Sequence, residues 1–227
     1  MNNKHSKKET NEGLSALSIY RGAGVSAIGA GILYIVIQFI HPPDDLSSVN
    51  SSTWVLVACL TLVMSLFSLI GITGVYLRQV REAGWLGLIG VLLFGLFWLI
   101  SLAFSFVEAF VLPLLTTDAE IFVEGMVGIF EGTDSGADLG IFPILAPLAG
   151  GLYMLGGLLL GIAIFRAGVL PRLAGVLLAC AAAATLATSI IPHPLDRIMA
   201  LPMGAALIWL GYALYVRSNI LNQQEVF

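Results

Sequence analysis

The sequence predicts an all-α integral membrane protein with six transmembrane helices, arranged as three helical hairpins, and with both termini in the cytoplasm. Two observations predict this fold class: the composition, and the distribution of the basic residues. Of the 227 residues, 58% are hydrophobic and 11% are charged, and the mean hydropathy is +0.96. In a soluble domain about a quarter of the residues are charged. The composition therefore excludes a water-soluble enzyme, a nucleic-acid-binding domain and a disordered regulator.

Six apolar stretches are long enough to cross a bilayer, whose hydrocarbon core is about 30 Å thick and requires roughly 20 apolar residues in a helix. Helices are favoured over a barrel because the stretches are continuous rather than alternating. The expected spans are 21–40, 54–77, 85–112, 141–165, 173–191 and 198–216. We expect residues 1–16 to form a flexible cytoplasmic tail, 17–217 the membrane domain, and 218–227 a second cytoplasmic tail.

The first span has a basic stretch in front of it, as a signal peptide does. The basic residues are Lys4, Lys7 and Lys8. The apolar stretch that follows is too long for a cleaved signal and has no A-x-A cleavage site. We therefore expect it to be retained as a membrane span.

The basic residues gather on one side of the membrane when the six spans are threaded in alternation. Every Lys and Arg except Arg197 falls before or at the start of the first span, after the sixth, or in the connections between spans two and three and spans four and five. By the positive-inside rule, that side is cytoplasmic. The outer side is expected to be acidic, with Asp44, Asp45, Asp118, Glu120, Glu124, Glu131, Asp134, Asp138 and Asp196.

The longest outer connection predicts a short amphipathic helix near residues 117–131. At the helical period, the stretch separates into an acidic face and an apolar face. The acidic face holds Glu120, Glu124 and Glu131, and the apolar face holds Phe122, Met126, Ile129 and Phe130. Such a helix lies on the membrane surface or over the bundle, where it covers helix ends or acts as a lid.

The even-numbered spans end alike, which indicates duplication of a helical hairpin. Each places an aromatic residue close before an arginine at the inner interface: Tyr76 and Arg78, Phe165 and Arg166, Tyr215 and Arg217. Small residues also recur at four-residue spacing, as in Gly22, Ser26 and Ala30 with Ala23, Ala27 and Gly31 alongside. Such spacing predicts close helix contacts in lipid.

Polar residues at the outer ends of the odd-numbered spans form the candidate site. The first span ends His41-Pro42-Pro43-Asp44, and the fifth ends His193-Pro194-Leu195-Asp196. Glu108 lies at nearly the same distance from an early glycine in the third span, so the duplication predicts that His41, His193 and Glu108 share one depth. Two imidazoles and a carboxylate suit Zn²⁺ or another divalent metal, with Asp44 and Asp196 orienting the rings.

The same residues are also typical of helix ends, and this interpretation requires less of the sequence. A proline disfavours helical geometry in the residue before it. An interfacial histidine can place its ring between lipid and water. A haem held by two axial histidines is a third interpretation.

The stretch 156–178 contains a helix end, a turn and a helix start in a recurring pattern. The helix ends Phe165-Arg166-Ala167-Gly168, the turn is Leu170-Pro171-Arg172, and the next helix begins Gly175-Val176-Leu177. This pattern resembles uncharacterised bacterial multi-pass membrane protein families, over the fourth to sixth spans only. The resemblance implies a bacterial-type plasma (inner) membrane location and no catalytic residue.

Three hypotheses about function remain. The leading one is a multi-pass plasma-membrane protein that acts as a non-enzymatic helical bundle and binds a partner protein or lipid through its acidic outer loop. Its partners would be the lipid bilayer and a membrane or extracytoplasmic protein, and not a nucleic acid. The second is a metal-dependent membrane hydrolase with an outward-facing site formed by His41, His193 and Glu108. The third is a small-solute carrier, which the lack of Lys, Arg, Asp and His in the middle of the spans disfavours.

Overall fold

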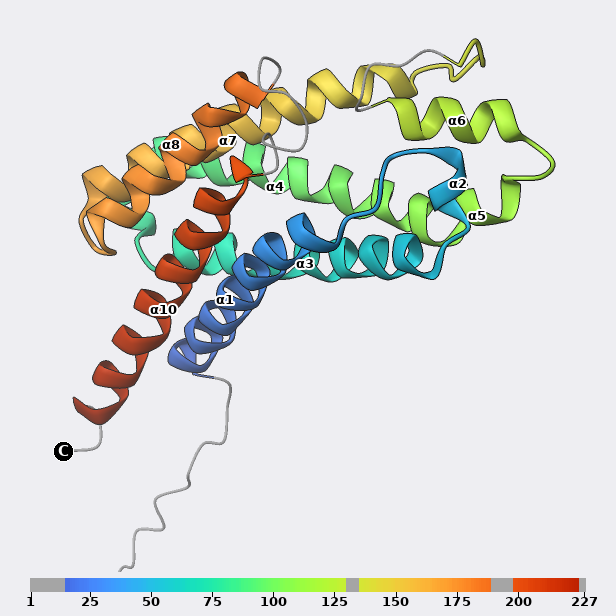
Figure 1. The fold of residues 1–227 in the computed structure, drawn as a ribbon. Helices are drawn as coiled ribbons and strands as arrows, with labels where there is room; N and C mark the ends of the chain where they lie inside the picture. The colour runs from blue at the N-terminus through green and yellow to red at the C-terminus, as the bar shows by residue number, and fades with distance from the viewer. Residues whose placement is uncertain (1–14, 130–134, 189–197, 225–227) are drawn as a thin grey trace, which may run out of the picture.

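The computed structural model describes residues 15–129, 135–188 and 198–224, which are mostly helical and contain no β-strand (Figure 1). The predicted all-α class is therefore correct for this part of the chain. The elements are α1 (Ala16–Ile40), α2 (Leu46–Val49), α3 (Ser52–Leu77), α4 (Val80–Phe110), α5 (Leu112–Leu115), α6 (Glu120–Gly128), the short 3₁₀ helix η1 (Phe142–Ile144), α7 (Leu145–Ala167), α8 (Arg172–Thr188) and α10 (Leu201–Gln224).

Local side chains determine where several helices begin and end. The hydroxyl of Ser15 accepts a hydrogen bond from the backbone N–H of Ser18, and Ser51 does the same for Trp54, so both serines cap their helices. The first helix ends at His41-Pro42, because Pro42 disfavours helical geometry in His41. The α7 helix ends at Gly168, whose φ of 64° is readily adopted only by glycine.

Four helices are long and apolar enough to cross a membrane, namely Ala16–Ile40, Ser52–Leu77, Val80–Phe110 and Phe142–Ala167. Two further apolar stretches, Arg172–Thr185 and Leu201–Arg217, are shorter within the described residues. The helices lie where the six spans were expected, and α10 continues to Gln224, beyond the expected end at 216. The fold is thus an apolar helical bundle compatible with a membrane protein, and six crossings remain a prediction.

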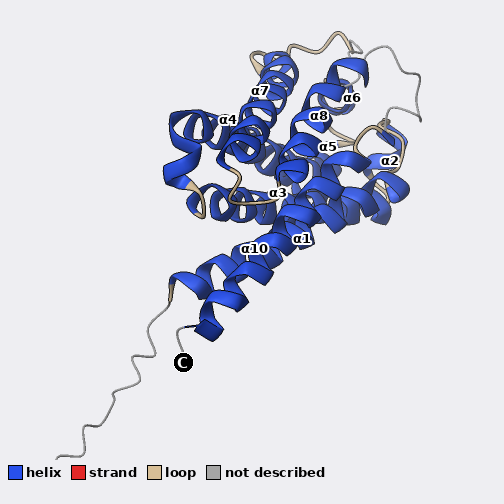
Figure 2. Cartoon of the chain, turned by 90° about the vertical axis from the view of Figure 1, so that its left-hand side faces the viewer, coloured by secondary structure: helices blue, strands red, loops and turns tan. Residues whose placement is uncertain are grey.

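The long helices are packed in a closed order. Consecutive helices contact one another from α1 through α3, α4 and α7 to α8, and α10 contacts both α8 and α1 (Figures 1 and 2). The first two expected hairpins, α1 with α3 and α4 with α7, pack as close pairs. The third differs, because α10 packs more extensively along α1 than along α8.

Small residues bring the helix backbones close together. A Cβ atom added to Gly31 of α1 would lie 2.4 Å from the carbonyl oxygen of Gly204 in α10, and one added to Gly74 of α3 would lie 2.2 Å from the Cβ of Ala23. Gly22 is exposed, with nothing within 4 Å of such an atom. The contact stripe of α1 therefore runs through the alanines and glycines alongside Gly22 rather than through Gly22 itself.

Aromatic side chains fill the centre of the bundle. Trp98 and Phe94 of α4 are fully buried, and their rings contact Tyr34 of α1, Phe97 of α4 and Tyr153 of α7. The hydroxyls of Tyr34 and Tyr153 are 3.2 Å apart, so one hydrogen bond joins α1 to α7 across the bundle. Within the described residues, the interior is therefore packed by side chains at this level.

The turn between α3 and α4 contains a buried amide without a partner. Gln79 is fully buried, and neither side-chain polar atom makes a hydrogen bond to a described residue. Its backbone carbonyl accepts from the N–H of Ala83, and the chain then bends at Gly84, whose φ is 54°. A buried polar group without a partner lowers stability by about 1–3 kcal/mol.

We expect Gln79→Met to raise the free energy of unfolding by about 1 kcal/mol, because it replaces the unpaired amide with an apolar side chain of similar size. Thermal unfolding in detergent measures the change. Gln38→Met is the matched control: the Gln38 amide donates to the carbonyl of Tyr34 at 3.3 Å, so its replacement should not stabilise the protein. A destabilised Gln79→Met variant would show instead that the amide binds a water or ligand.

Candidate functional site

One end of the bundle carries a cap formed by α2, α5 and α6, at the right in Figure 1. A hydrophobic cluster, separate from the aromatic centre of the bundle, packs the cap against α3 and α4. Its buried members are Val49, Trp54, Phe104, Leu112, Val123, Met126 and Val127. The α6 helix lies within the stretch where an amphipathic helix was expected, and its Met126 is buried while Glu120 and Glu124 are exposed. The apolar face of α6 thus packs over the bundle.

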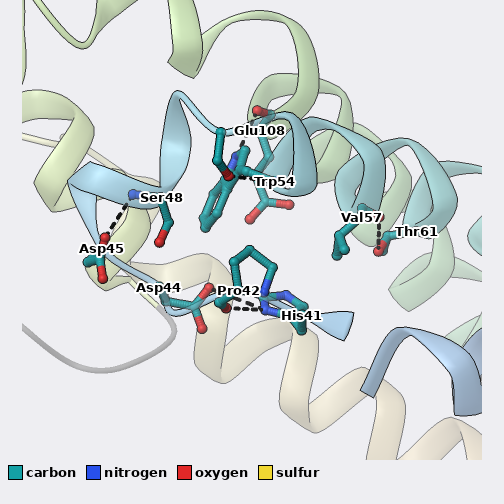
Figure 3. A network of polar contacts seen from close by, with 10 residues as sticks. His41, Pro42, Asp44, Asp45, Ser48, Trp54, Val57, Thr61 and Glu108 are labelled. Atoms are coloured by element: carbon teal, nitrogen blue, oxygen red, sulfur yellow. Dashed lines mark hydrogen bonds and ion pairs between the residues drawn. The ribbon is translucent and has the colours of Figure 1, made fainter. Parts of the chain in front are cut away.

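A small cavity lies beneath the cap, between the end of α1 and the neighbouring parts of α3 and α4. It is lined by His41, Pro42, Trp54, Val57, Ala58, Thr61 and Glu108, and its volume is about 20 Å³. Figure 3 shows the Glu108 carboxylate and the His41 ring facing this space from opposite sides. A volume of this size accommodates roughly one water molecule or one metal ion.

The His41 ring is oriented by its neighbours. Its Nδ1 lies 2.8 Å from the carbonyl oxygen of Pro42 and 3.9 Å from a carboxylate oxygen of Asp44. A proton on Nδ1 can donate to that carbonyl, which leaves the lone pair of the neutral ring on Nε2. The ring also meets Trp54 edge to face, with centroids 6.4 Å apart. These contacts restrict the rotation of the imidazole.

Trp54 connects the two sides of the cavity. Its indole Nε1 donates to the backbone carbonyl of Glu108 at 3.1 Å, so the start of α3 is tied to the last turns of α4. Trp54 was not identified from the sequence as a residue of the candidate site. The Ser51 cap just before it is the sequence signal that places Trp54 in the first turn of a helix, near His41.

The α1–α3 connection is also ordered by a carboxylate. Asp45 caps α2, since its oxygen accepts hydrogen bonds from the Ser47 hydroxyl at 2.6 Å and the Ser48 N–H at 2.8 Å. These bonds stabilise the charged form, so they hold the pKa of Asp45 below its ordinary value. Asp45 is therefore ionised at neutral pH and adds negative charge to the cap.

The predicted metal ligands are only partly placed. His41 and Glu108 line one cavity, and Asp44 lies beside His41 as expected for a residue that orients the ring. His193 and Asp196 lie outside the described residues. Within the part of the chain that the structure describes, no group of three His, Cys, Asp or Glu residues could hold a metal ion. The zinc site therefore remains a prediction.

The opposite end of the bundle carries arginines. Arg21 of α1 lies over the Tyr215 ring of α10, with 5.6 Å from Cζ to the centroid, and Arg172 lies over Phe165 at 5.9 Å. Arg217 donates to the carbonyl of Val169 in the α7–α8 turn. The two bundle ends thus differ in charge: carboxylates are exposed on the cap, and arginines lie at the other end.

Comparison with known proteins gives no family assignment, because no protein-family model, curated protein or solved structure matches this chain.

Proposed function

We propose that the chain is a multi-pass protein of a bacterial-type plasma membrane that acts as a non-enzymatic helical bundle and binds a partner protein through its outer cap. Both termini would be cytoplasmic. The start of α1 and the end of α10 lie at the arginine-bearing end, as the contact of Arg21 with Tyr215 indicates. The positive-inside rule assigns arginine-rich ends to the cytoplasm.

The exposed surface of α6 is the single observation that carries this proposal. Its apolar face is already buried against the bundle, and yet Ile121 is 59% exposed between the exposed carboxylates of Glu120 and Glu124. Leu114 of the neighbouring α5 is 76% exposed. Exposed apolar side chains bordered by charges on an extramembrane element are typical of protein interfaces. A partner with a basic rim around an apolar centre would complement this surface.

The packed interior supports binding over transport. Tyr34, Trp98 and Tyr153 pack against one another in the middle of the bundle, so side chains fill the described part of its interior at this level. A carrier requires a substrate site near this level. The small-solute carrier is therefore the least supported of the three hypotheses.

Site-specific photo-cross-linking in the native cells tests the proposal. A photoreactive residue at position 121 should give a discrete protein adduct, identifiable by mass spectrometry, and Glu120→Lys with Glu124→Lys should abolish it. The matched control is a probe at Leu96, a 48% exposed residue in the middle of α4, which should give lipid adducts only. Lipid adducts at both positions, or an adduct that survives the charge reversal, would contradict the proposal.

A metal-dependent hydrolase at the outer face is the second candidate, because His41 and Glu108 converge on one cavity of suitable size. Elemental analysis of the detergent-purified protein, after dialysis against a weak chelator, tests this candidate. A stoichiometric metal that disappears in a His41→Ala/His193→Ala variant would support it. The same metal content in both proteins, or none, would leave both histidines as helix-end residues.

A further inference from the structure

An apolar groove runs along the exposed surface between α1 and α3, near the arginine-bearing end. It has a volume of about 350 Å³ and is lined by Ile19, Ala23, Leu69, Ile70, Thr73, Gly74 and Leu77. The one polar side chain among these residues, Thr73, donates its hydroxyl hydrogen to the Leu69 carbonyl at 2.7 Å. The lining therefore presents no unpaired polar group of its own side chains to an occupant.

The groove exists because the residues at its bottom have small side chains and those along its sides have large ones. Ala23 and Gly74 bring the two helix backbones together, so nothing larger than hydrogen fits at Gly74. Ile19, Ile70 and Leu77 remain 53%, 41% and 44% exposed along the sides. In a bilayer, such a recess is filled by hydrocarbon, since an unfilled one loses van der Waals contacts.

A cation without a partner among the described residues lies next to a groove-lining residue in the chain. Arg78 directly follows Leu77 and is partly buried, and no carboxylate, carbonyl or aromatic ring among the described residues pairs with its guanidinium. Glu82, one turn further along, does not come within ion-pair distance of it. Tyr20 donates to the Leu77 carbonyl at 3.5 Å, which holds α1 and α3 together at this point. A partly buried arginine without a counter-ion favours binding of an external anion.

We propose that this groove binds an anionic glycerophospholipid, with one acyl chain between α1 and α3 and the phosphate paired with Arg78. The guanidinium has the fork geometry that binds phosphate oxygens in pairs. Arginines near the inner membrane surface recognise anionic headgroups in this way. This proposal is independent of the outer cap and of the protein partner proposed for it.

A second apolar groove provides an internal comparison. It lies between α7 and α8, has a volume of about 240 Å³, and is lined by Gly161, Ile162, Phe165, Val176, Ala179 and Cys180. The cation beside this groove, Arg172, already lies over the Phe165 ring. We therefore expect the α7–α8 groove to hold acyl chains with little preference for the headgroup.

Native mass spectrometry of the full chain, titrated with phosphatidylglycerol or phosphatidylcholine of identical acyl chains, tests the proposal. The parent should retain phosphatidylglycerol about tenfold more tightly, as one charge-assisted pair provides. Arg78→Gln should abolish this preference while phosphatidylcholine binding stays unchanged. Thr73→Trp, which fills the groove, should weaken the binding of both lipids.

Cys180→Trp in the α7–α8 groove and Arg81→Gln are the matched controls, and both should keep the preference for phosphatidylglycerol. Thermal unfolding of each variant shows whether the bundle is intact, and Arg78→Lys should restore part of the preference in a folded background. Equal retention of the two lipids by the parent would overturn the proposal. So would a preference that survives Arg78→Gln or is lost in Arg81→Gln.

Discussion

Replacement of Gly31 by leucine is expected to separate α1 from α10 and to lower the free energy of unfolding by about 3 kcal/mol. A Cβ atom at Gly31 would lie 2.4 Å from the carbonyl oxygen of Gly204 and 2.7 Å from a side-chain carbon of Ile208. Because the closest obstacle is backbone, a rotamer change cannot relieve the overlap. Thermal unfolding in detergent, together with the monodisperse fraction after purification, measures the loss.

Gly22→Leu is the matched control, since it makes the same chemical change in the same helix. Nothing lies within 4 Å of a Cβ atom at Gly22, so the new side chain would extend into lipid. We expect its unfolding temperature to stay within the experimental error of the parent's. If both variants lose stability equally, the close contact between α1 and α10 is not what stabilises this pair of helices.

Trp98→Ala is expected to lower the free energy of unfolding by about 3 kcal/mol, because it opens a cavity in the centre of the bundle. The Trp98 side chain is fully buried and contacts Tyr34, Phe94 and Phe97. Its loss also removes the packing that positions the hydrogen bond between Tyr34 and Tyr153. Thermal unfolding and the near-UV circular dichroism of the remaining aromatic residues report the two effects.

Trp98→Phe separates packing from hydrogen bonding at the same position. The indole N–H of Trp98 is buried and has no partner among the described residues, so phenylalanine keeps most of the ring contacts and removes an unpaired donor. We expect a loss of less than about 1.5 kcal/mol. A loss as large as that of Trp98→Ala would indicate that the indole nitrogen binds a water molecule or another group.

The helices could be predicted closely from the sequence, but their ends only in part. The expected span 21–40 became α1, Ala16–Ile40, whose additional turn depends on the Ser15 cap. The expected span 198–216 overlaps α10, which begins at Leu201 and continues to Gln224. Apolar length shows where lipid begins and ends. Helical hydrogen bonding continues beyond that boundary wherever the backbone allows it.

Only part of the cavity lining could be predicted, and the remainder depended on helix rotation. His41 and Glu108 were paired because the hairpin duplication predicts the same depth for both, and both line the same cavity. Trp54 and Thr61 were missed, because the sequence does not show which face of α3 meets α1. The sequence also did not show which face of α1 makes the close helix contacts. Small residues recur at four-residue spacing both from Gly22 and from Ala23.

The sequence by itself determined the all-α class, the positions of the apolar helices and the separation of charge between the two ends. These properties follow from transfer of apolar side chains into lipid and from helical hydrogen bonding, both of which are local to each segment. Only the tertiary structure decided that α10 packs along α1, that aromatic rings fill the centre, and that an apolar groove lies between α1 and α3. These features depend on how each helix is rotated about its axis. That rotation is determined by contacts between segments that are distant in the sequence.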